Sequence, residues 1–135
     1  MSDFEDFEKK AAQQREKNSK LIEEFEEYLK EKGLSGKTVE KHGSNIAFFV
    51  DVFLIYEDVL TPAEGIEEIG IFLSSWFPRK ALWASPAHVK DYCAGFKKFY
   101  KFLLEKGVIE EEEYRDMLEK IKEDKDDWLQ ANTFF

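Results

Sequence analysis

The chain has 135 residues, of which 43% are hydrophobic and thirteen are Phe, and this composition excludes intrinsic disorder for the body of the protein. The formal net charge of −9 argues against indiscriminate nucleic-acid binding. The one cysteine, Cys93, cannot form an internal disulfide, and no apolar N-terminal segment with a cleavage site is present, so we expect a cytoplasmic protein. The longest apolar stretch, residues 46–56, is too short to span a bilayer, so we expect no membrane partner.

Residues 1–18 are expected to form a polar helical arm. Ser2, with Glu5 three residues later, has the spacing of a capping box at a helix N-terminus. The residues from Glu8 to Lys20 are polar almost throughout, which leaves the arm without a continuous apolar stripe. We therefore expect this segment to be helical but weakly anchored.

Two predicted helices end in the same way. The first covers about residues 19–32, with apolar residues three and four positions apart, and ends at Gly33-Leu34. A later helix ends at Gly107-Val108. A glycine followed by an aliphatic residue is typical of a left-handed C-terminal cap, in which the aliphatic side chain folds back on the helix. We therefore predict a positive φ at both glycines, with Leu34 and Val108 packed against the preceding helices.

Two further helices are predicted from their start signals. Ser35 is the expected N-cap of a helix that runs to about Tyr56, and Gly43 within it indicates a close helix crossing or a local bend. The sequence Thr-Pro-Ala-Glu at residues 61–64 has proline at the first helical position and glutamate where a capping box requires it. The helix that follows is expected to end at Pro78.

The last two predicted helices differ in charge. A Ser-Pro pair at residues 85–86 begins a helix with an aromatic core face and a lysine-bearing opposite face. Residues 86–109 have a net charge of +3, whereas residues 110–135 have a net charge of −6. A fifth helix is predicted from about Glu110, and residues 124–135 are interpreted as an acidic and aromatic tail.

Three motifs occur in an order that is typical of a known helical domain. A helix ends in Gly-Leu-Ser at residues 33–35, Thr38 begins the next helix, and a late aromatic helix, residues 96–103, ends in Phe-Leu before Gly107. This order resembles the SAM-like N-terminal core-binding domain of phage integrases and tyrosine site-specific recombinases. The resemblance covers about residues 21–121.

The resemblance implies an all-α fold, a single orthogonal bundle of four to five helices over residues 19–123. In that family the bundle forms half of a clamp on double-stranded DNA, with the second and fourth helices facing the duplex. Matching positions on those helices, together with two cations before the fourth helix, are candidate DNA-binding residues. They are Lys37, Lys41, Arg79, Lys80, Lys90, Lys97, Lys98 and Lys101.

Two interpretations of the fourth-helix lysines remain open. Lys90, Lys97 and Lys101 fall near one helical face, where they either contact phosphates or simply solvate an exposed surface. Aromatic residues alternate with these lysines, and their helical spacing predicts that they belong to the core rather than to a base-stacking platform.

The chain is expected to be non-enzymatic. The catalytic set of the recombinases belongs to a second domain in that family, and neither His42 nor His88 has an arginine three residues later. His42 is expected on a helix surface. His42, His88 and Cys93 lack the spacing of a zinc site, so we expect no metal, no cofactor and no small-molecule substrate.

Large apolar residues outside the predicted core are candidate partner-binding residues. Trp83, in the loop of residues 79–85, either caps the bundle or anchors a partner. The terminal apolar residues should dock, either on their own bundle or on another molecule. The sequence thus leaves two functions open: a DNA-binding or recombination-accessory module, and a protein-interaction module on the same fold that binds a protein or its own copy. For the second function, the partner-binding residues are Trp83, Trp128, Phe134 and Phe135.

Overall fold

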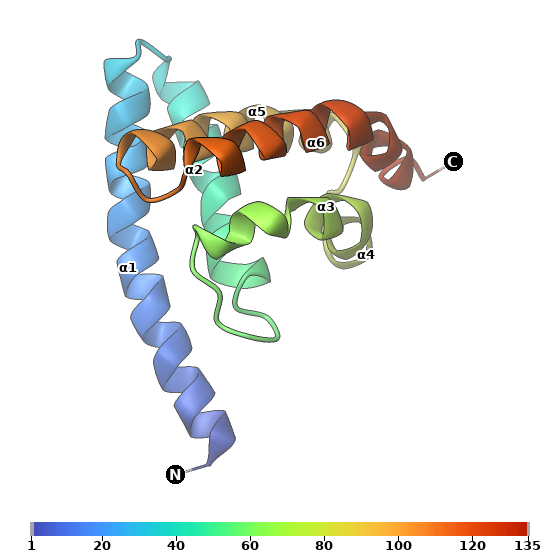
Figure 1. Cartoon of the computed structure of the whole chain (residues 1–135). Coiled ribbons are helices and arrows are strands. Elements are labelled where there is room, and N and C mark those ends of the chain that lie inside the picture. The colour runs from blue at the N-terminus through green and yellow to red at the C-terminus, as the bar shows by residue number, and fades with distance from the viewer. Residues whose placement is uncertain (1, 135) are drawn as a thin grey trace. The chain divides into compact units, whose positions relative to one another are not determined.

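The computed structural model describes residues 2–134, and no strand occurs among them (Figure 1). The all-α fold class predicted from the sequence is confirmed. The described residues divide into two compact units between Gly65 and Ile66, which we call unit 1 and unit 2. The boundaries expected after residues 18 and 123 fall inside single helices, α1 (Asp3–Glu31) and α6 (Glu111–Ala131).

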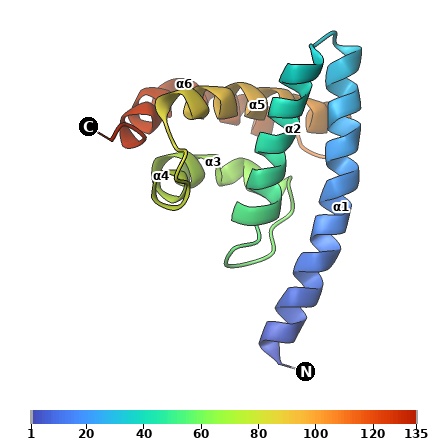
Figure 2. The same ribbon diagram turned by 180° about the vertical axis from the view of Figure 1, so that it is seen from behind.

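Unit 1 is a helix pair extended by a π-helical segment. α1 packs beside α2 (Gly36–Phe48), and α2 continues directly into the π-helical segment η1 (Phe49–Phe53) (Figures 1 and 2). Apolar side chains three and four residues apart give each helix a buried stripe. The buried apolar residues of this pair include Phe25, Leu29, Val39, Ile46 and Phe49.

The helix starts predicted at Ser35 and Ser85 are confirmed by their hydrogen bonds, whereas at Thr61 only the capping-box bonds form: Pro62 lies in a turn, and the 3-10 turn η2 (Glu64–Glu67) follows instead of an α-helix. The Oγ atoms of Ser35 and Ser85 each accept the backbone N–H three residues ahead, at 3.3 Å in both cases. Thr61 and Glu64 form the expected capping box: the Thr61 N–H donates to Glu64 Oε1 at 2.8 Å, and the Glu64 N–H donates to Thr61 Oγ1 at 3.2 Å. These caps can be predicted from the sequence because each depends on two residues three positions apart.

The two glycine-terminated helices end as predicted. Gly33 has φ 87° and Gly107 has φ 78°. The N–H of Leu34 donates to the Leu29 carbonyl at 3.2 Å, and the equivalent bond of Val108 measures 2.9 Å, the pattern of a Schellman cap. The expected side-chain contact is weaker. Leu34 is partly buried, but Val108 is 48% exposed, so it does not fold fully back on its helix.

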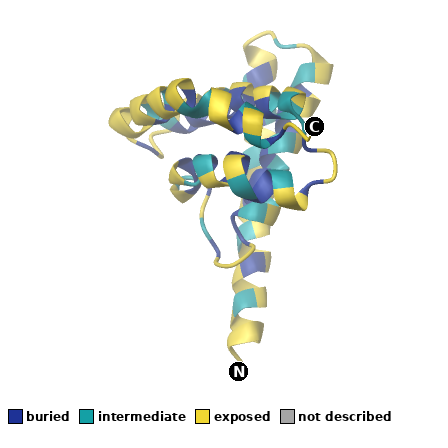
Figure 3. Cartoon of the chain, turned by 90° about the vertical axis from the view of Figure 1, so that its right-hand side faces the viewer, coloured by how far each residue is buried: buried dark blue, intermediate teal, exposed yellow. Residues whose placement is uncertain are grey.

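The N-terminal half of α1 is anchored by a small apolar cluster. Ala11 is buried together with Ile55 and Val59, and Phe7 packs against this cluster. Figure 3 shows buried and exposed positions alternating along the helix toward its N-terminal end. The arm was expected to be helical and weakly anchored; it is helical, and most of its residues are exposed, with Ala11 and Asn18 as its buried contacts.

A buried asparagine adds a polar anchor to the same half of α1. Asn18 Nδ2 donates to the Val50 carbonyl at 3.3 Å and to Asp51 Oδ1 at 2.9 Å. Gln14 Nε2 in turn donates to Asn18 Oδ1 at 2.9 Å. Carbonyls near a helix end lack an intrahelical donor, so Asn18 satisfies a backbone group that burial would otherwise leave unpaired.

The contact between α1 and α2 is close at Gly43. A Cβ atom at Gly43 would lie 2.5 Å from Glu26 Oε2, so the structure favours the close crossing over the local bend. The neighbouring His42 is buried, and its predicted surface position is therefore wrong. Both residues are buried, whereas the sequence interpretation placed only Gly43 at a helix crossing.

Unit 2 contains two long antiparallel helices and a series of short ones. α5 and α6 lie side by side, and α6 also contacts the short helices (Figures 1 and 2). A 3-10 turn, η2 (Glu64–Glu67), lies at the junction of the two units. The helices that follow it are α3 (Ile69–Ile71), the π-helical segment η3 (Phe72–Trp76), α4 (Phe77–Lys80), α5 (Pro86–Glu105) and α6.

Pro78 does not end its helix, contrary to the sequence interpretation. Residues 77–80 form α4, and Pro78 occupies its first turn. The Phe77 N–H donates to the Phe72 carbonyl, five residues earlier, as in a π-helix. The helix is therefore already irregular where the proline N–H is missing, which allows the chain to pass through Pro78 without a break.

Aromatic rings form the core of unit 2. Phe72 makes edge contacts with Tyr92 and Phe96, at centroid distances of 5.1 and 6.2 Å, and Phe77 contacts Tyr92 at 5.2 Å. The aromatic residues of α5 that alternate with lysines are buried, which confirms that they are core residues. They include Phe96, Phe99, Tyr100 and Phe102.

The C-terminal segment is helical and docks within its own unit. α6 continues to Ala131, and Trp128 is only 3% exposed. A Cβ atom at Gly70 would lie 3.7 Å from Trp128 Cζ2, which places the indole against α3. Residues 124–131 therefore extend α6 rather than form a tail. Phe134 is 57% exposed, and Phe135 lies outside the described residues.

Candidate nucleic-acid interface

Three exposed lysines share one face of α5. Lys90, Lys97 and Lys101 are seven and four residues apart, and at 100° per residue they fall within about 40° of each other. The opposite face carries the buried rings of Phe96 and Phe99. We call the three lysines the lysine ridge. The aromatic core fixes the rotation of α5 and thereby keeps the ridge in solvent.

Local signals fix the two ends of this helix. Ser85 caps the N-terminus, and its Oγ lies 2.8 Å from His88 Nδ1. Pro86 occupies the first turn, where its missing N–H costs nothing. The Gly107 cap ends the helix just after Glu105. The lysine ridge therefore lies on a rigid element rather than on a loop.

No carboxylate forms an ion pair with the ridge lysines Lys90, Lys97 and Lys101 within residues 2–134. Lys101 Nζ lies 5.5 Å from the centroid of the Tyr114 ring on α6, a cation–π distance that leaves the ammonium hydrated. Burial and the charge of Glu105 raise the pKa of the Tyr114 hydroxyl. Glu105 thus limits the positive surface at the C-terminal end of α5.

The charges of two lysines on different helices affect the pKa of the buried Cys93 thiol. Burial raises the pKa of Cys93, while the charges of Lys125 on α6 and Lys97 on α5 partly oppose this rise. Both ammonium groups therefore lie within electrostatic range of one sulfur atom. The sequence analysis did not single out Lys125, because acidic residues surround it in a segment with a net charge of −6.

The other candidate cations of unit 2 lie off the ridge. Lys98 is about 80° from Lys90 around α5 and is partly buried. Arg79 and Lys80 are exposed at the end of α4, and Arg79 Nε donates to the Ser75 carbonyl at 3.0 Å. Lys98 therefore does not continue the line of the ridge lysines, and Arg79 and Lys80 belong to another helix.

Lys37 and Lys41 belong to unit 1. Both are exposed on α2 and lie one helical turn apart. The structure therefore provides two separate sets of candidate cations, one in each unit, and only the α5 set forms a ridge of three on one helix.

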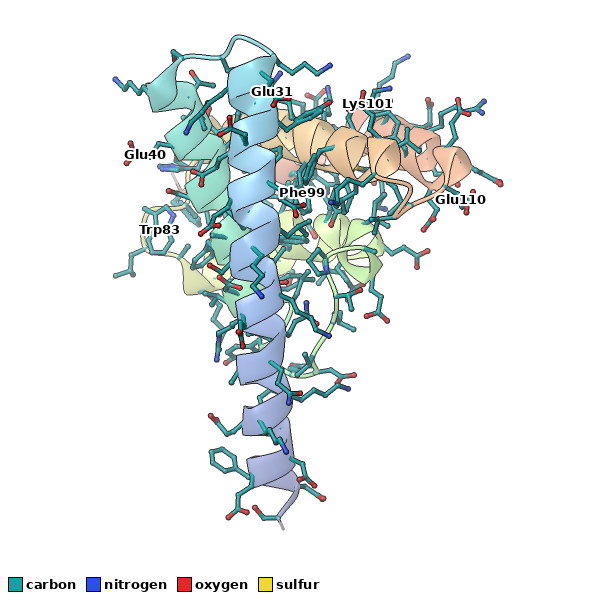
Figure 4. All side chains as sticks on the ribbon, turned by 90° about the vertical axis from the view of Figure 1, so that its left-hand side faces the viewer. Glu31, Glu40, Trp83, Phe99, Lys101 and Glu110 are labelled. Atoms are coloured by element: carbon teal, nitrogen blue, oxygen red, sulfur yellow. The ribbon has the colours of Figure 1, made fainter. Side chains whose placement is uncertain are left out.

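An exposed apolar tip precedes α5. Trp83 is 49% exposed, and its ring makes an edge contact with Phe77 at a centroid distance of 6.3 Å. The neighbouring Leu82 is fully exposed, while Ala81 and Ala84 on either side are buried. Trp83 therefore covers part of the aromatic core at Phe77, while Leu82 and the rest of the indole remain exposed. Sequence reasoning missed Leu82, because a single leucine in a loop carries no signal of its exposure. Figure 4 places Trp83 and Lys101 apart, consistent with their positions near opposite ends of α5.

A small hollow in unit 2 offers a different kind of surface. Its volume is about 260 Å³, below the range of about 300–1,000 Å³ that is typical of small-molecule sites. It contains carboxylates, one ammonium and an apolar floor, and lacks a paired nucleophile and base. Its lining residues are Ile66, Glu67, Glu113, Asp116, Met117 and Lys120.

The residues with soft ligand atoms are not grouped as metal sites. His42 is buried in unit 1, His88 bonds with Ser85, and Cys93 is buried in unit 2. Within the part of the chain that the structure describes, no three His, Cys, Asp or Glu side chains are placed so that they could hold a metal ion.

Comparison with protein-family models, with curated proteins and with solved structures gives no match. None of the helices among residues 2–134 combines the length and the apolar character needed to cross a lipid bilayer. What supports a function is therefore the arrangement of the chain's own side chains.

Proposed function

We propose that the chain is a non-enzymatic module that binds double-stranded DNA through the lysine ridge of α5, in the manner of an integrase core-binding domain. The observation that carries the proposal is the ridge itself. Its three lysines share one exposed face and have no ion-pair partner among residues 2–134, in a chain whose net charge is −9.

The spacing of the ridge suits a phosphate backbone. Lys90 and Lys101 are about 16 Å apart along the axis of α5, at 1.5 Å per residue. Duplex DNA presents one phosphate per about 1.7 Å of its axis, so three ammonium groups at this spacing reach separate phosphates. The ridge consists of lysines alone, which act on phosphates as compact point charges, and it lacks the asparagine and glutamine that pair with adenine and the forked guanidinium of arginine. We therefore expect affinity that depends on salt and not on DNA sequence.

The absence of strand-transfer activity is part of the same proposal. The only arginines are Arg15, Arg79 and Arg115, and none belongs to a His-x-x-Arg motif. Burial raises the pKa of Tyr92 and of Tyr100, which makes both hydroxyls poor nucleophiles. A cytoplasmic location, inferred from the single free thiol, is compatible with a DNA partner.

Fluorescence anisotropy on two duplexes of unrelated sequence tests the proposal between ~50 and ~200 mM salt. We expect the two duplexes to bind equally. Changing Lys90, Lys97 and Lys101 to Glu should remove binding, or lower the slope of log affinity against log salt by about 2.7, since each phosphate contributes about 0.9. A control variant changes three exposed α1 lysines to Glu and has the same net charge. Its positions are Lys9, Lys10 and Lys17.

Two results would contradict the proposal. If the wild-type chain does not bind duplex DNA at ~50 mM salt, the proposal fails. It also fails if the control variant loses as much affinity as the ridge variant, because binding would then follow net charge rather than the ridge.

A second candidate function, a protein-interaction module, is favoured by the exposed tip of Leu82 and Trp83. Exposed Trp side chains are common anchors at interfaces. If the tip joins two copies of the chain, light scattering should show a mass that rises with concentration, and changing both residues to Ser should return the chain to a monomer. A concentration-independent monomer mass for the wild-type chain would remove this form of the alternative.

A further inference from the structure

The loop between α4 and α5 is a tight turn with two apolar side chains at its corner. The Ala84 N–H donates to the Ala81 carbonyl at 3.2 Å, which closes the turn and puts Leu82 and Trp83 at its two central positions. Both alanines are buried, so the turn is held at each end while Leu82 is fully exposed. Side chains on a turn that is already fixed lose little conformational freedom when they bind. We call Leu82 and Trp83 the apolar tip.

The apolar tip has cations beside it. Arg79 and Lys80 are exposed in the last turn of α4, just before the loop. Arg79 Nε donates to the Ser75 carbonyl at 3.0 Å, and within residues 2–134 its guanidinium takes part in no ion pair. Such a surface is complementary to a depression that has an apolar floor and a negatively charged rim.

The small hollow of unit 2 has both of these properties. Its floor contains Ile66 and Met117, which are buried. Its rim carries three exposed carboxylates, none of which takes part in an ion pair within residues 2–134. They belong to Glu67, Glu113 and Asp116. The remaining lining residue, Lys120, pairs with Asp124 at 3.3 Å, so the hollow as a whole is negative.

The apolar tip lies too far from the hollow of its own chain to enter it. The tip precedes the first residue of α5, whereas the hollow lies beside the first half of α6, which begins only after α5 has ended. The 20 residues of α5 span about 30 Å at 1.5 Å per residue. Figure 4 shows the same separation between Trp83 and Glu110, the N-cap of α6. A contact between a tip and a hollow therefore joins two molecules.

We propose that the apolar tip of one copy binds in the hollow of a second copy, with Arg79 of the first copy beside the carboxylates of the second. This inference rests on the second candidate function and is independent of the lysine ridge. In the contact, Leu82 and Trp83 leave water for the apolar floor, and the guanidinium offsets the repulsion among the three carboxylates. The volume of about 260 Å³ suits an inserted side chain.

The contact is heterologous, because the tip and the hollow are different surfaces. Two joined copies still have one unused tip and one unused hollow, so further copies can add head to tail. A contact between two tips would instead use the same surface on both copies and stop at a dimer.

A complementation experiment followed by light scattering tests the inference. The tip variant is Leu82→Ser/Trp83→Ser, and the hollow variant is Glu67→Lys/Asp116→Lys. The mass of the wild-type chain should rise between ~20 μM and ~1 mM, because a contact this small lies below the size of about 1,200 Å² that stable interfaces reach. Each variant alone should stay a monomer. Their equimolar mixture should form a complex of two chains and nothing larger, because only one tip and one hollow are intact.

A matched control is Glu112→Lys/Glu119→Lys, which changes the net charge by the same amount at exposed α6 positions outside the hollow. The control should associate like the wild-type chain. Circular dichroism checks that each variant is folded, and Leu82→Ser alone serves as the tip variant if the loss of Trp83 unfolds the chain.

Three results would overturn the inference. The first is a hollow variant that associates like the wild-type chain, the second is a mixture that stays monomeric, and the third is a control that loses association as completely as the hollow variant. The second candidate function survives these results if the tip variant alone has lost association. A wild-type chain that is monomeric up to ~1 mM would remove both.

Discussion

Asn132, just after α6, donates through Nδ2 to the carbonyl oxygen of Leu73, 59 residues earlier, at 2.8 Å. Asn18 of α1 makes the corresponding bond to the Val50 carbonyl, 32 residues later, at 3.3 Å. Leu73 and Val50 are each the second residue of a π-helical segment. Each unit therefore holds its π segment with one buried asparagine from a long helix or its end.

Asn132→Ala should lower the free energy of unfolding by about 1–3 kcal/mol, because the Leu73 carbonyl would stay buried without this donor. Urea unfolding followed by circular dichroism measures the change. Gln130→Ala, at an exposed position of the same helix end, should stay within about 0.5 kcal/mol of wild type. Equal midpoints for the two variants would show that the asparagine bond contributes nothing.

Gly33→Val and Gly107→Val should each destabilise the fold by about 1–2 kcal/mol, since both glycines have positive φ. A Cβ atom at either position meets no atom within 4 Å, so the cost comes from the backbone and not from a clash. Gly107→Asn should therefore cost less than Gly107→Val, because asparagine tolerates this conformation. Thermal unfolding of the three variants checks the order, and an equally stable Gly107→Val would contradict it.

Trp128→Ala should destabilise the chain by about 3–5 kcal/mol, the range for a buried large aromatic residue. Phe134→Ala should change stability by less than about 0.5 kcal/mol, because that side chain is exposed. Since Trp128 docks within its own unit, deletion of residues 128–135 should lower the melting temperature by the same amount at every protein concentration. A concentration-dependent shift would instead indicate docking on a second copy.

The chain should lose stability in alkali because of its buried tyrosines. Burial raises the pKa of Tyr92 and Tyr100 above the ordinary value of 10.0. Above about pH 10 the unfolded state releases the tyrosine protons while the folded state keeps them, so the free energy of unfolding falls as pH rises. Urea midpoints should therefore decrease above pH 10, and Tyr92→Phe should reduce this decrease. A pH-independent midpoint across this range would exclude the effect.

Local signals account for what the sequence predicted correctly. Caps such as Ser35 and Gly107, and the apolar period of α5, depend on residues within one or two turns. The bonds of Asn18 and Asn132 join segments 32 and 59 residues apart, and no spacing rule encodes them. The division into two units has the same origin, since it depends on contacts between segments far apart in the sequence.

The candidate site follows the same rule. The period of Lys90, Lys97 and Lys101 on one helix predicted a common face, and the structure places all three on it. Lys125 and Lys97 belong to different helices, so no sequence spacing predicts that the charges of both lower the pKa of Cys93. The exposure of Leu82 depends on the burial of Ala81 and Ala84 beside it, which composition does not reveal.

The burial of Cys93 makes the native protein a convenient scaffold for site-specific chemistry. The thiolate is the reactive form of cysteine, and burial both shields the sulfur and disfavours that form. A cysteine introduced at an exposed position, such as Lys90→Cys, should therefore react with a maleimide dye well before Cys93 does. Fluorophores or cross-linkers can thus be attached to one chosen face while the wild-type thiol stays in place.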